Sequence, residues 1–265
     1  MVSIIFIDLI RVITAFCFLG FAALKDFKTR EVSNKVWIMF APIALILTTV
    51  NVMLTNNMSV LWLMLFSFAV TSVLAVITFY LGLFGGADAK ALICLSIAVP
   101  VYPKIFQPLL SVASPFFPIS VLFYAAMLAS LTAVFILVSN IAWKLKSGRE
   151  FFNGFEGESV LKKMLVLFTA KKLKIESLEK NPTYQLVERI IELSDGKIKR
   201  RLAPFVKASD QQADFGKIKH LIANGALPNE LWATPALPML VYITVGFLTA
   251  LFLGDFLFWL AINLS

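Results

Sequence analysis

Long apolar runs separated by short polar connections make up most of this chain. A helix that crosses the hydrocarbon core of a bilayer needs about 20 mostly apolar residues. Six runs approach this pattern, and each predicts a membrane-spanning helix: residues 3–24, 36–54, 60–83, 89–103, 118–143 and 236–261. The fold class we expect is therefore an all-α polytopic membrane protein with about six transmembrane helices.

One long polar stretch, residues 144–232, interrupts the apolar runs before the last of them. Within it, an apolar patch flanked by lysines over residues 158–174 predicts a helix at the membrane surface. Apolar residues at helical spacing over residues 183–194 predict a second helix, and residues 210–229 have the composition of loops. We therefore expect three parts: residues 1–143 with five transmembrane helices, residues 144–232 as a small, mostly helical cytoplasmic domain, and residues 233–265 with the last transmembrane helix.

The composition supports a membrane protein. Of the 265 residues, 59% are apolar and 15% are charged, against about 45–50% and about 25% in soluble domains. These values exclude a disordered chain and a collagen-like fibre. The formal net charge is +8, and a basic excess in a membrane protein marks cytoplasmic loops and attraction to anionic lipid. We therefore expect membrane lipid, and no nucleic acid, as a partner.

The basic residues also predict the orientation of the chain. Seventeen of the 24 Lys and Arg residues lie in residues 144–232, and four more lie in the connection at residues 25–35. The connection at residues 55–59 and the tail at residues 263–265 carry no charged side chain. By the positive-inside rule, the connections after the first, third and fifth helices face the cytoplasm, so both termini lie outside it in a multi-pass protein of the cell membrane. The first run lacks the cleavage pattern of a signal peptide, so we expect it to remain as an anchor.

The sequence does not favour a metal or cofactor site. The two cysteines, Cys17 and Cys94, lie in apolar runs and are expected to be small buried residues. The one histidine, His220, lies in the polar stretch. The chain contains no CxxC pair, no GxxxxGK[ST] and no GxGxxG. We expect no bound metal and no cofactor.

Acidic residues within or beside the apolar runs are the candidates for function, because a carboxylate in hydrocarbon costs about 3 kcal/mol even on a lenient scale. Asp8 lies three residues before Arg11, so a local ion pair explains both. Asp255 lies near the outer end of the last run and is interpreted as a boundary or packing residue. Asp26 ends the first run and Asp88 opens the fourth, so the predicted topology places both at the cytoplasmic face.

Asp26 and Asp88 together predict acid–base chemistry. Two carboxyl groups a few ångström apart do not both ionise cheaply, so one of them keeps its proton. Such a pair can deprotonate a water and protonate a peptide group, as in aspartic proteases. Gly85 and Gly86 directly precede Asp88, and glycines allow a backbone to turn sharply or to approach a substrate closely. Asp26 taken alone also fits a solvated charge among its basic neighbours.

Three short motifs, in their order along the chain, resemble those of membrane-embedded aspartyl proteases. The first, DFKTREVSN at residues 26–34, is similar to the first-aspartate motif of type IV prepilin peptidases, with VSN where the family has Ile-Pro-Asn. The second resembles the GxGD signature, with alanine at its third position, and consists of Gly85, Gly86, Ala87 and Asp88. The third matches the PALP element of presenilin-type proteases and consists of Pro235, Ala236, Leu237 and Pro238. With the six runs and the basic stretch before the last one, nearly the whole chain looks most like archaeal preflagellin and prepilin peptidases.

The resemblance implies a membrane aspartyl endopeptidase with Asp26 and Asp88 as catalytic residues at the cytoplasmic face. Its implied partners are archaellin (preflagellin) or type IV pilin-like precursors, from which it removes a short basic leader peptide. Residues 85–87 and 235–238 are expected to position the active-site backbone or the substrate, and Glu31 is a candidate contact for the leader. Bacterial members often carry paired CxxC motifs and also methylate the new N-terminus. Because this chain lacks those cysteines, we expect no methyltransferase activity.

Two other interpretations remain open from the sequence. A presenilin-type intramembrane protease shares GxGD and PALP, but this chain has six apolar runs rather than nine, and Asp26 lies beside a basic connection. An ion-coupled transporter or channel, which is a different class of protein, would use Asp26 and Asp88 as ion ligands. Helices broken by Gly and Pro are typical of transporters too. The clustering of both acids at one face, with no visible inverted repeat, favours the peptidase.

Overall fold

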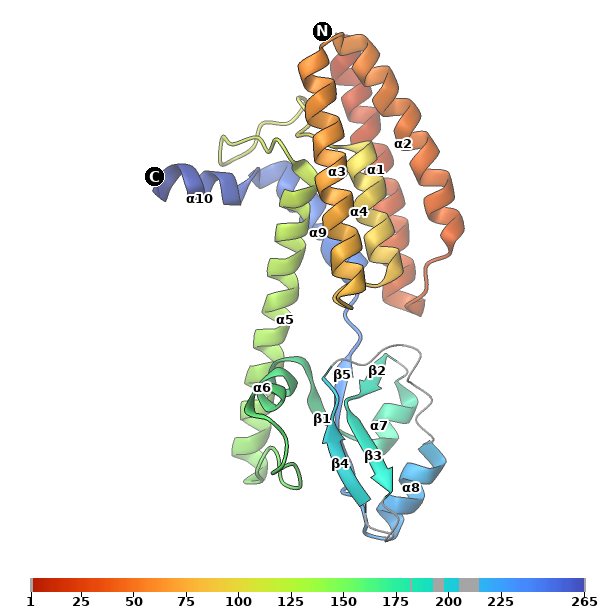
Figure 1. The fold of residues 1–265 in the computed structure, drawn as a ribbon, viewed down its shortest axis with the longest axis vertical. Coiled ribbons are helices and arrows are strands. Elements are labelled where there is room, and N and C mark those ends of the chain that lie inside the picture. Colours follow the sequence, from red (N-terminus) through yellow and green to blue (C-terminus); the bar gives the residue numbers. More distant parts are fainter. Residues whose placement is uncertain (1, 182, 193–197, 205–214, 265) are drawn as a thin grey trace. The chain divides into compact units, whose positions relative to one another are not determined.

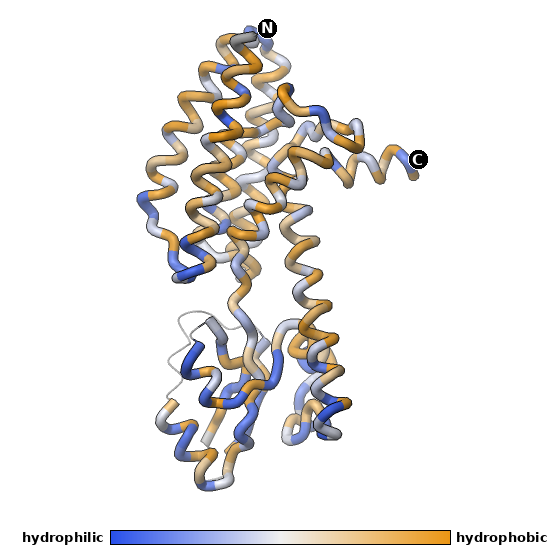
Figure 2. The backbone as a smooth tube through the Cα atoms, turned by 180° about the vertical axis from the view of Figure 1, so that it is seen from behind, coloured by the Kyte–Doolittle hydropathy of each residue, from blue (hydrophilic) through white to orange (hydrophobic). Residues whose placement is uncertain are grey.

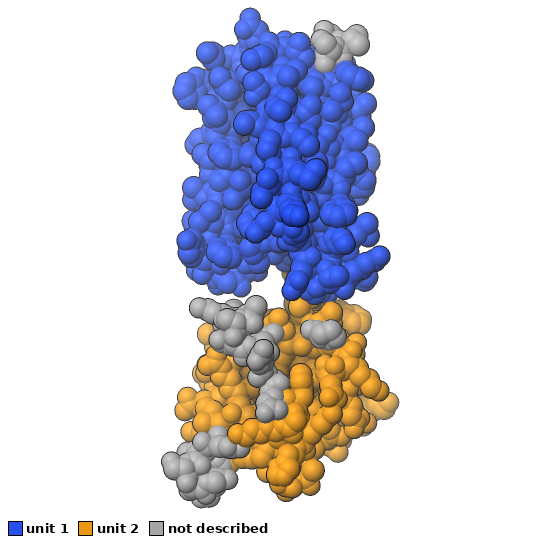
Figure 3. Space-filling model, turned by 90° about the vertical axis from the view of Figure 1, so that its right-hand side faces the viewer, with its two compact units in different colours: residues 1–129, 238–265 blue, residues 130–237 orange. Residues whose placement is uncertain are grey.

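The structure is a computed structural model of the chain, and it describes residues 2–181, 183–192, 198–204 and 215–264. The chain forms two compact units, which Figure 3 colours separately. Unit 1 comprises residues 1–129 and 238–265, and unit 2 comprises residues 130–237. The two units differ in their secondary structure and are described in turn.

Unit 1 is built from helices of mostly apolar sequence (Figure 1). In chain order they are α1 (Val2–Thr29), α2 (Asn34–Thr55), α3 (Met58–Tyr80), α4 (Gly86–Ala98), the first part of α5 (Phe117–Ser147), α9 (Met239–Leu253) and α10 (Phe256–Leu264). Helices α1 to α4 lie side by side, and α9 packs against α1 and α4. Figure 2 shows apolar residues along almost the full length of these helices.

Among the described residues, four helices are long and apolar enough to cross a membrane, namely α1, α2, α3 and α5. The pair α9 and α10, bent by 49°, counts as a fifth if it forms one span. Helix α4 covers most of the predicted span at residues 89–103 but has 13 residues. It is therefore about 20 Å long, against about 30 Å of hydrocarbon. It ends at Ala98, two residues before Pro100, because proline disfavours helix in the residue before it. The structure supports a mostly helical, multi-pass membrane protein and does not confirm six crossings.

A glycine allows α9 to approach α5 closely. A Cβ atom on Gly246 would lie 2.7 Å from the Val121 carbonyl oxygen, so a larger residue there would push the helices apart. Between α1 and α2, the rings of Phe18 and Phe40 stack with their centroids 4.8 Å apart. These contacts belong to the main apolar core, which lies entirely within unit 1.

A buried polar cluster joins three helices of unit 1. Arg11 Nη1 donates to Asp8 Oδ1 at 2.9 Å, which confirms the expected ion pair. Asn51 Nδ2 of α2 donates to the same oxygen at 3.0 Å, and Arg11 Nε donates to the Ala98 carbonyl oxygen at the end of α4 at 2.9 Å. Buried charges require this kind of pairing. The cluster therefore explains both charged residues as structural.

Asp255 also has a structural explanation. Its Oδ1 accepts from the Phe258 N–H at 3.0 Å, which caps the first turn of α10. Its Oδ2 accepts from Ser120 Oγ at 2.8 Å. The structure thus agrees with the interpretation of Asp255 as a boundary and packing residue.

Within its described residues, unit 2 combines the last part of α5 with short strands and short helices. In chain order they are α6 (Val160–Thr169), β1 (Lys171–Lys174), α7 (Ile175–Lys180), β2 (Tyr184–Leu186), β3 (Glu188–Glu192), β4 (Ile198–Leu202), α8 (Phe215–Ala223) and β5 (Glu230–Pro235). Strand β5 is central in an antiparallel sheet with the order β1-β5-β2, and β3 pairs with β4. In the register of the sheet, Lys174 lies opposite Glu230 and Tyr184 lies opposite Pro235.

The prediction of an all-α chain is wrong, because unit 2 contains antiparallel sheets beside its helices. The sequence predicts a helix over residues 183–194, whereas β2 and β3 occupy residues 184–186 and 188–192, and residues 193 and 194 lie outside the described part. Over so short a run the apolar spacing fits a helix or a strand. Contacts with β5 favour strands here: β2 pairs with β5, and the Trp232 N–H of β5 donates to Glu188 of β3. Trp232 lies 44 residues after Glu188 in the chain, so a short window of sequence does not reveal this partner.

Two smaller expectations for the polar stretch are also corrected. The helix predicted over residues 158–174 exists as α6, but its last residues form β1 because they pair with β5. The loops predicted over residues 210–229 contain α8, while residues 210–214 lie outside the described part.

A buried ion pair ties the β3–β4 pair to the central strand of unit 2. Arg200 Nε and Nη2 donate to Glu188 Oε2 at 2.9 and 2.8 Å. The Trp232 N–H of β5 donates to Glu188 Oε1 at 2.7 Å. Burial raises the pKa of the Glu188 carboxyl above its ordinary value, and the charge of Arg200 opposes that rise. Both oxygens of this side chain therefore accept hydrogen bonds that stabilise the sheet.

Candidate active site

Asp26 lies in the last turn of α1. The helix ends where Arg30 adopts a left-handed conformation, with φ of +57°, and donates its N–H to the Asp26 carbonyl oxygen at 3.1 Å. The Asp26 side chain accepts, through Oδ2, from the Leu240 N–H at 3.2 Å. Leu240 belongs to the first turn of α9, where backbone N–H groups lack partners within the helix. This bond fixes the Asp26 carboxylate against the start of α9.

Asp88 lies in the first turn of α4 and is 8% exposed. Gly85 is the N-cap residue of this helix, and its N–H donates to Asp88 Oδ2 at 2.8 Å. A Cβ atom on Gly85 would lie 3.2 Å from the same oxygen, so the carboxylate and the backbone approach closely because the residue is glycine. A Cβ atom on Gly86 would meet Phe79 at an ordinary 3.6 Å, and Ala87 is half-buried. The glycine requirement is therefore strongest at position 85.

Helices α1, α4 and α9 bring the two predicted acids together at one end of unit 1. Asp26 and Asp88 are near enough for their charges to interact. Arg30 in turn is near enough to act on the charge of Asp26. The Arg30 Nε and Nη1 atoms are buried and have no hydrogen-bond partner among the described residues. The site therefore contains two carboxyl groups and a guanidinium group with donors to spare.

Two contacts of the site involve residues that sequence analysis did not single out. Lys90 Nζ of α4 donates to Asn34 Oδ1, at the start of α2, at 2.7 Å. This bond links the end of the first motif to the helix that carries Asp88. The sequence did contain a signal for Lys90, because it is a positively charged residue two positions after Asp88. The backbone donor of Leu240 leaves no signal in the sequence, because every residue except proline carries an N–H.

A cavity of about 660 Å³ lies at the connection between α1 and α2. Glu31, the predicted leader contact, lines this cavity and is exposed. The other residues that line it are Phe21, Lys25, Thr29, Val32, Ser33, Asn34 and Val36. On α1, Lys25 is the direct chain neighbour of Asp26. The cavity therefore offers apolar surface and one acid close in sequence to a candidate catalytic residue.

The PALP residues, 235–238, connect β5 to α9. Pro235 is the last residue of β5, Ala236 donates its N–H to a backbone carbonyl oxygen of unit 2, and Leu237 is exposed. Pro238 is the N-cap residue of α9, so the helix begins directly after it, as the missing donor of proline predicts. Leu240, two residues further on, is the residue that bonds Asp26.

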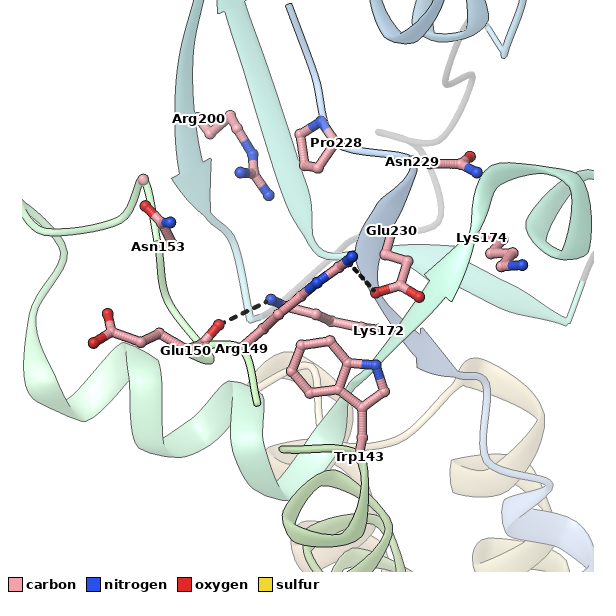
Figure 4. A pocket seen from close by; sticks show the side chains of 11 residues that line it. Trp143, Arg149, Glu150, Asn153, Lys172, Lys174, Arg200, Pro228, Asn229 and Glu230 are labelled. Carbon is pink, nitrogen blue, oxygen red and sulfur yellow. Dashed lines mark hydrogen bonds and ion pairs between the residues drawn. The ribbon is translucent and has the colours of Figure 1, made fainter. Parts of the chain in front are cut away.

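A second cavity, of about 750 Å³, lies within unit 2 (Figure 4). Arg149 lies 3.8 Å from Glu230 across it. Lys172 Nζ donates to the Glu150 carbonyl oxygen at 3.3 Å and lies 4.5 Å from the ring centroid of Trp143. Burial lowers the pKa of Lys172. The charged groups drawn in Figure 4 are mostly engaged with one another or with aromatic rings, which suits a structural role for this cavity.

The described residues contain no group of three or more His, Cys, Asp or Glu arranged to hold a metal ion. Of the two cysteines, Cys94 is buried as expected, whereas Cys17 is exposed, so the expectation of a buried residue is wrong there.

Comparisons with known proteins agree with this arrangement. The model of the type IV leader peptidase family matches residues 13–138, which include both acids. The model of the archaeal peptidase A24 C-terminus, type II, matches residues 162–256. The preflagellin peptidase of Methanococcus voltae is 28% identical over 240 residues, which cover 88% of this chain and 91% of that protein. The preflagellin peptidases of Methanococcus maripaludis and Methanocaldococcus jannaschii are each 25% identical, over 88% of this chain and over 90% and 89% of theirs.

The fold defines a mostly helical, multi-pass membrane protein, and the comparisons place it among the proteases. The chain is similar to the type IV leader peptidase family over residues 13–138 and to the archaeal form of that family over residues 162–256. This similarity indicates a protease and supports leader-peptide cleavage as its activity.

Proposed function

We propose that the chain is an aspartyl endopeptidase that removes the short basic leader from archaellin or pilin-like precursors at the cytoplasmic face of the membrane. Asp26 and Asp88 are its catalytic residues. The observation that carries this proposal is the proximity of the two carboxyl groups within unit 1, on the two motifs that resemble those of the family. The names of the relatives support the substrate class, since each is called a preflagellin peptidase.

Each carboxyl group is oriented through one oxygen. Asp26 Oδ2 is held by the Leu240 N–H, and Asp88 Oδ2 is held by the Gly85 N–H. We assign the other oxygen of each, Oδ1, to water and substrate. Because both donors are backbone N–H groups at helix starts, they orient the carboxyl groups without any rearrangement of donor side chains.

Cleavage then follows from one ionised and one protonated carboxyl group. The ionised carboxylate takes a proton from a water, whose oxygen attacks the scissile carbonyl carbon. The protonated carboxyl gives its proton to the carbonyl oxygen, which produces a neutral tetrahedral intermediate. When the C–N bond breaks, the leaving nitrogen receives the proton that was taken from the water, and a hydroxyl proton returns to the other aspartate. The products are the free leader and a mature subunit with a new N-terminal amine, with the two acids restored between them.

The cavity at the α1–α2 connection is the proposed binding site for the leader. Glu31 supplies the negative charge that a basic leader requires, and Phe21, Val32 and Val36 supply apolar surface. Lys25 lines the same cavity, so bulk attraction between opposite charges does not account for recognition. Recognition therefore depends on where Glu31 and the ionised aspartate lie.

The direct test is incubation of the purified, reconstituted full-length protein with a pilin-like precursor whose basic leader is intact. We expect a shorter product whose mass and N-terminal sequence show a single cut after the leader, and no added methyl group. A precursor with its leader already removed is the control. If the intact precursor is unchanged under conditions in which the protein is folded, the proposed function is wrong, and the interpretation as an ion-coupled transporter gains support.

A further inference from the structure

Helix α6 of unit 2 carries an exposed apolar stripe. Val160 and Leu161 are 69% and 68% exposed, Met164 is 55% exposed and Phe168 is 42% exposed. At 100° per residue these four side chains fall within about a third of the helix circumference. On the other side, Val166 is fully buried in the core of unit 2. An apolar stripe of this width on a helix whose opposite face is already packed requires a partner of its own.

Asn140 of α5 fixes the C-terminal end of this helix. Its Nδ2 donates to the Leu167 and Ala170 carbonyl oxygens at 2.9 and 2.7 Å, and the side chain is 3% exposed. The Thr234 hydroxyl donates to the neighbouring Thr169 carbonyl oxygen at 2.6 Å. These bonds pair carbonyl groups that a helix end otherwise leaves without partners. Helix α6 is therefore held at a defined level along α5.

That level lies near the end of the apolar part of α5. Helix α5 is one of the candidate spans, and its exposed apolar side chains continue through Val138 and Ile141. The basic residues of its last turn, Lys144 and Lys146, follow directly. A span of about 20 residues from the start of α5 ends close to Asn140. The residue that fixes α6 thus lies where α5 leaves the hydrocarbon.

The direction of α6 suits a helix that lies in the plane of the membrane. In Figure 1, α5 runs from top to bottom while α6 is viewed close to its own axis, so α6 lies across α5. A helix that lies across a membrane-spanning helix runs parallel to the bilayer surface. Lys163 is half-buried on the face beside the apolar stripe, where its amine can reach lipid headgroups. Lys162, which lies on the opposite face, donates to Glu158 Oε2 at 2.9 Å within unit 2.

We propose that α6 is an interfacial helix whose apolar stripe, formed by Val160, Leu161, Met164 and Phe168, inserts among the acyl chains of a leaflet that contains anionic lipid. The level set by Asn140, the orientation across α5 and the position of Lys163 beside the stripe together select a bilayer as the partner. This inference rests on α5 as a membrane span and is independent of the proposed cleavage reaction. Its consequence is that the bilayer holds α6 as well as the spanning helices.

Fluorescence quenching by lipid tests this proposal in the full-length protein. In a Cys17→Ala, Cys94→Ala background, Leu161→Cys and Met164→Cys are each labelled with an environment-sensitive dye. The protein is placed in nanodiscs of phosphatidylcholine and phosphatidylglycerol, with or without bromine on the upper part of the acyl chains. The matched control is Ile191→Cys on β3, because Ile191 is an apolar residue of unit 2 with 42% exposure. All three positions are exposed, so the label leaves the core packing unchanged.

We expect brominated lipid to lower the fluorescence at positions 161 and 164 by at least about half and to leave position 191 unchanged. Equal fluorescence at all three positions, with and without bromine, would overturn the proposal. Energy transfer between labels on different copies at position 161, without quenching by lipid, would also overturn it, because the stripe would then contact a second copy of the chain.

Discussion

At the scale of single residues, the site depends on two short backbone contacts. The Leu240 N–H holds one oxygen of Asp26 and the Gly85 N–H holds one oxygen of Asp88, the two proposed catalytic residues. Neither donor requires a particular side chain, but the contact at Gly85 requires the absence of one. A change of one methyl group at this position therefore tests whether the orientation of Asp88 matters for catalysis.

Gly85→Ala should lower the rate of precursor cleavage by at least about tenfold, because its Cβ would lie 3.2 Å from Asp88 Oδ2 and would displace the carboxylate. The measurement is kcat and KM for a precursor peptide, and we expect the loss mainly in kcat. Gly20→Ala in α1 is the control, because a Cβ atom there meets nothing within 4 Å. Equal rates for Gly85→Ala and Gly20→Ala would show that this contact does not orient the catalytic acid.

Glu31 is the residue at which recognition of the leader is testable. Glu31→Gln removes one negative charge from an exposed site, so we expect the preference for a basic over a neutral leader to fall by about two- to fivefold. The measurement is the ratio of kcat/KM for two precursors that differ only in leader charge. Glu176→Gln, an exposed acid of unit 2, is the matched control. A preference that is the same in both variants would remove Glu31 from recognition.

At the scale of elements, β5 holds unit 2 together and its C-terminal end leads into α9. It pairs with β1 and β2, and its Trp232 N–H binds the carboxylate of Glu188. The sequence does not predict this arrangement, because the strands are three to six residues long and their partners lie far apart in the chain. The long apolar helices behave differently, since each forms its hydrogen bonds within one run of sequence. Five of the six predicted runs accordingly appear as long helices or as a bent pair, and the proline-rich exit shortens α4.

Glu188→Gln should destabilise unit 2 by about 3 kcal/mol, because it leaves the Arg200 guanidinium beside a neutral group in a buried position. Hydrogen exchange of the β3, β4 and β5 amides in the full-length protein measures this change, and we expect exchange there to be faster by about 100-fold. Glu179→Gln is the control. Its ion pair with Lys219 is exposed, and such a pair contributes about 0–1 kcal/mol. Equal exchange in both variants would contradict a stabilising role for the buried pair.

At the scale of the whole molecule, the candidate active site is assembled from the end of one helix and the starts of two others. Asp26 and Leu240 are 214 residues apart in the chain, and the bundle of unit 1 brings them into hydrogen-bonding distance. The sequence predicts both acids, because each interrupts or borders an apolar run beside a recognisable motif. It does not predict the donors around them, because backbone N–H groups, Arg30 and Lys90 acquire their positions through helix packing. Asp8 and Asp255 show the opposite case, since buried partners satisfy both and explain them without catalysis.

The central claim is that Asp26 and Asp88 both carry out the cleavage, and the measurement that tests it most directly is precursor processing by single asparagine variants. Asp26→Asn and Asp88→Asn should each lower the rate by at least about 100-fold, because either change removes one partner of the acid–base pair. Both should still insert into the membrane and fold, since asparagine keeps an oxygen that accepts the backbone bond. Asp255→Asn is the matched control and should cleave within a few-fold of the wild-type rate. If either Asp26→Asn or Asp88→Asn retains near wild-type processing, the two-aspartate account is wrong.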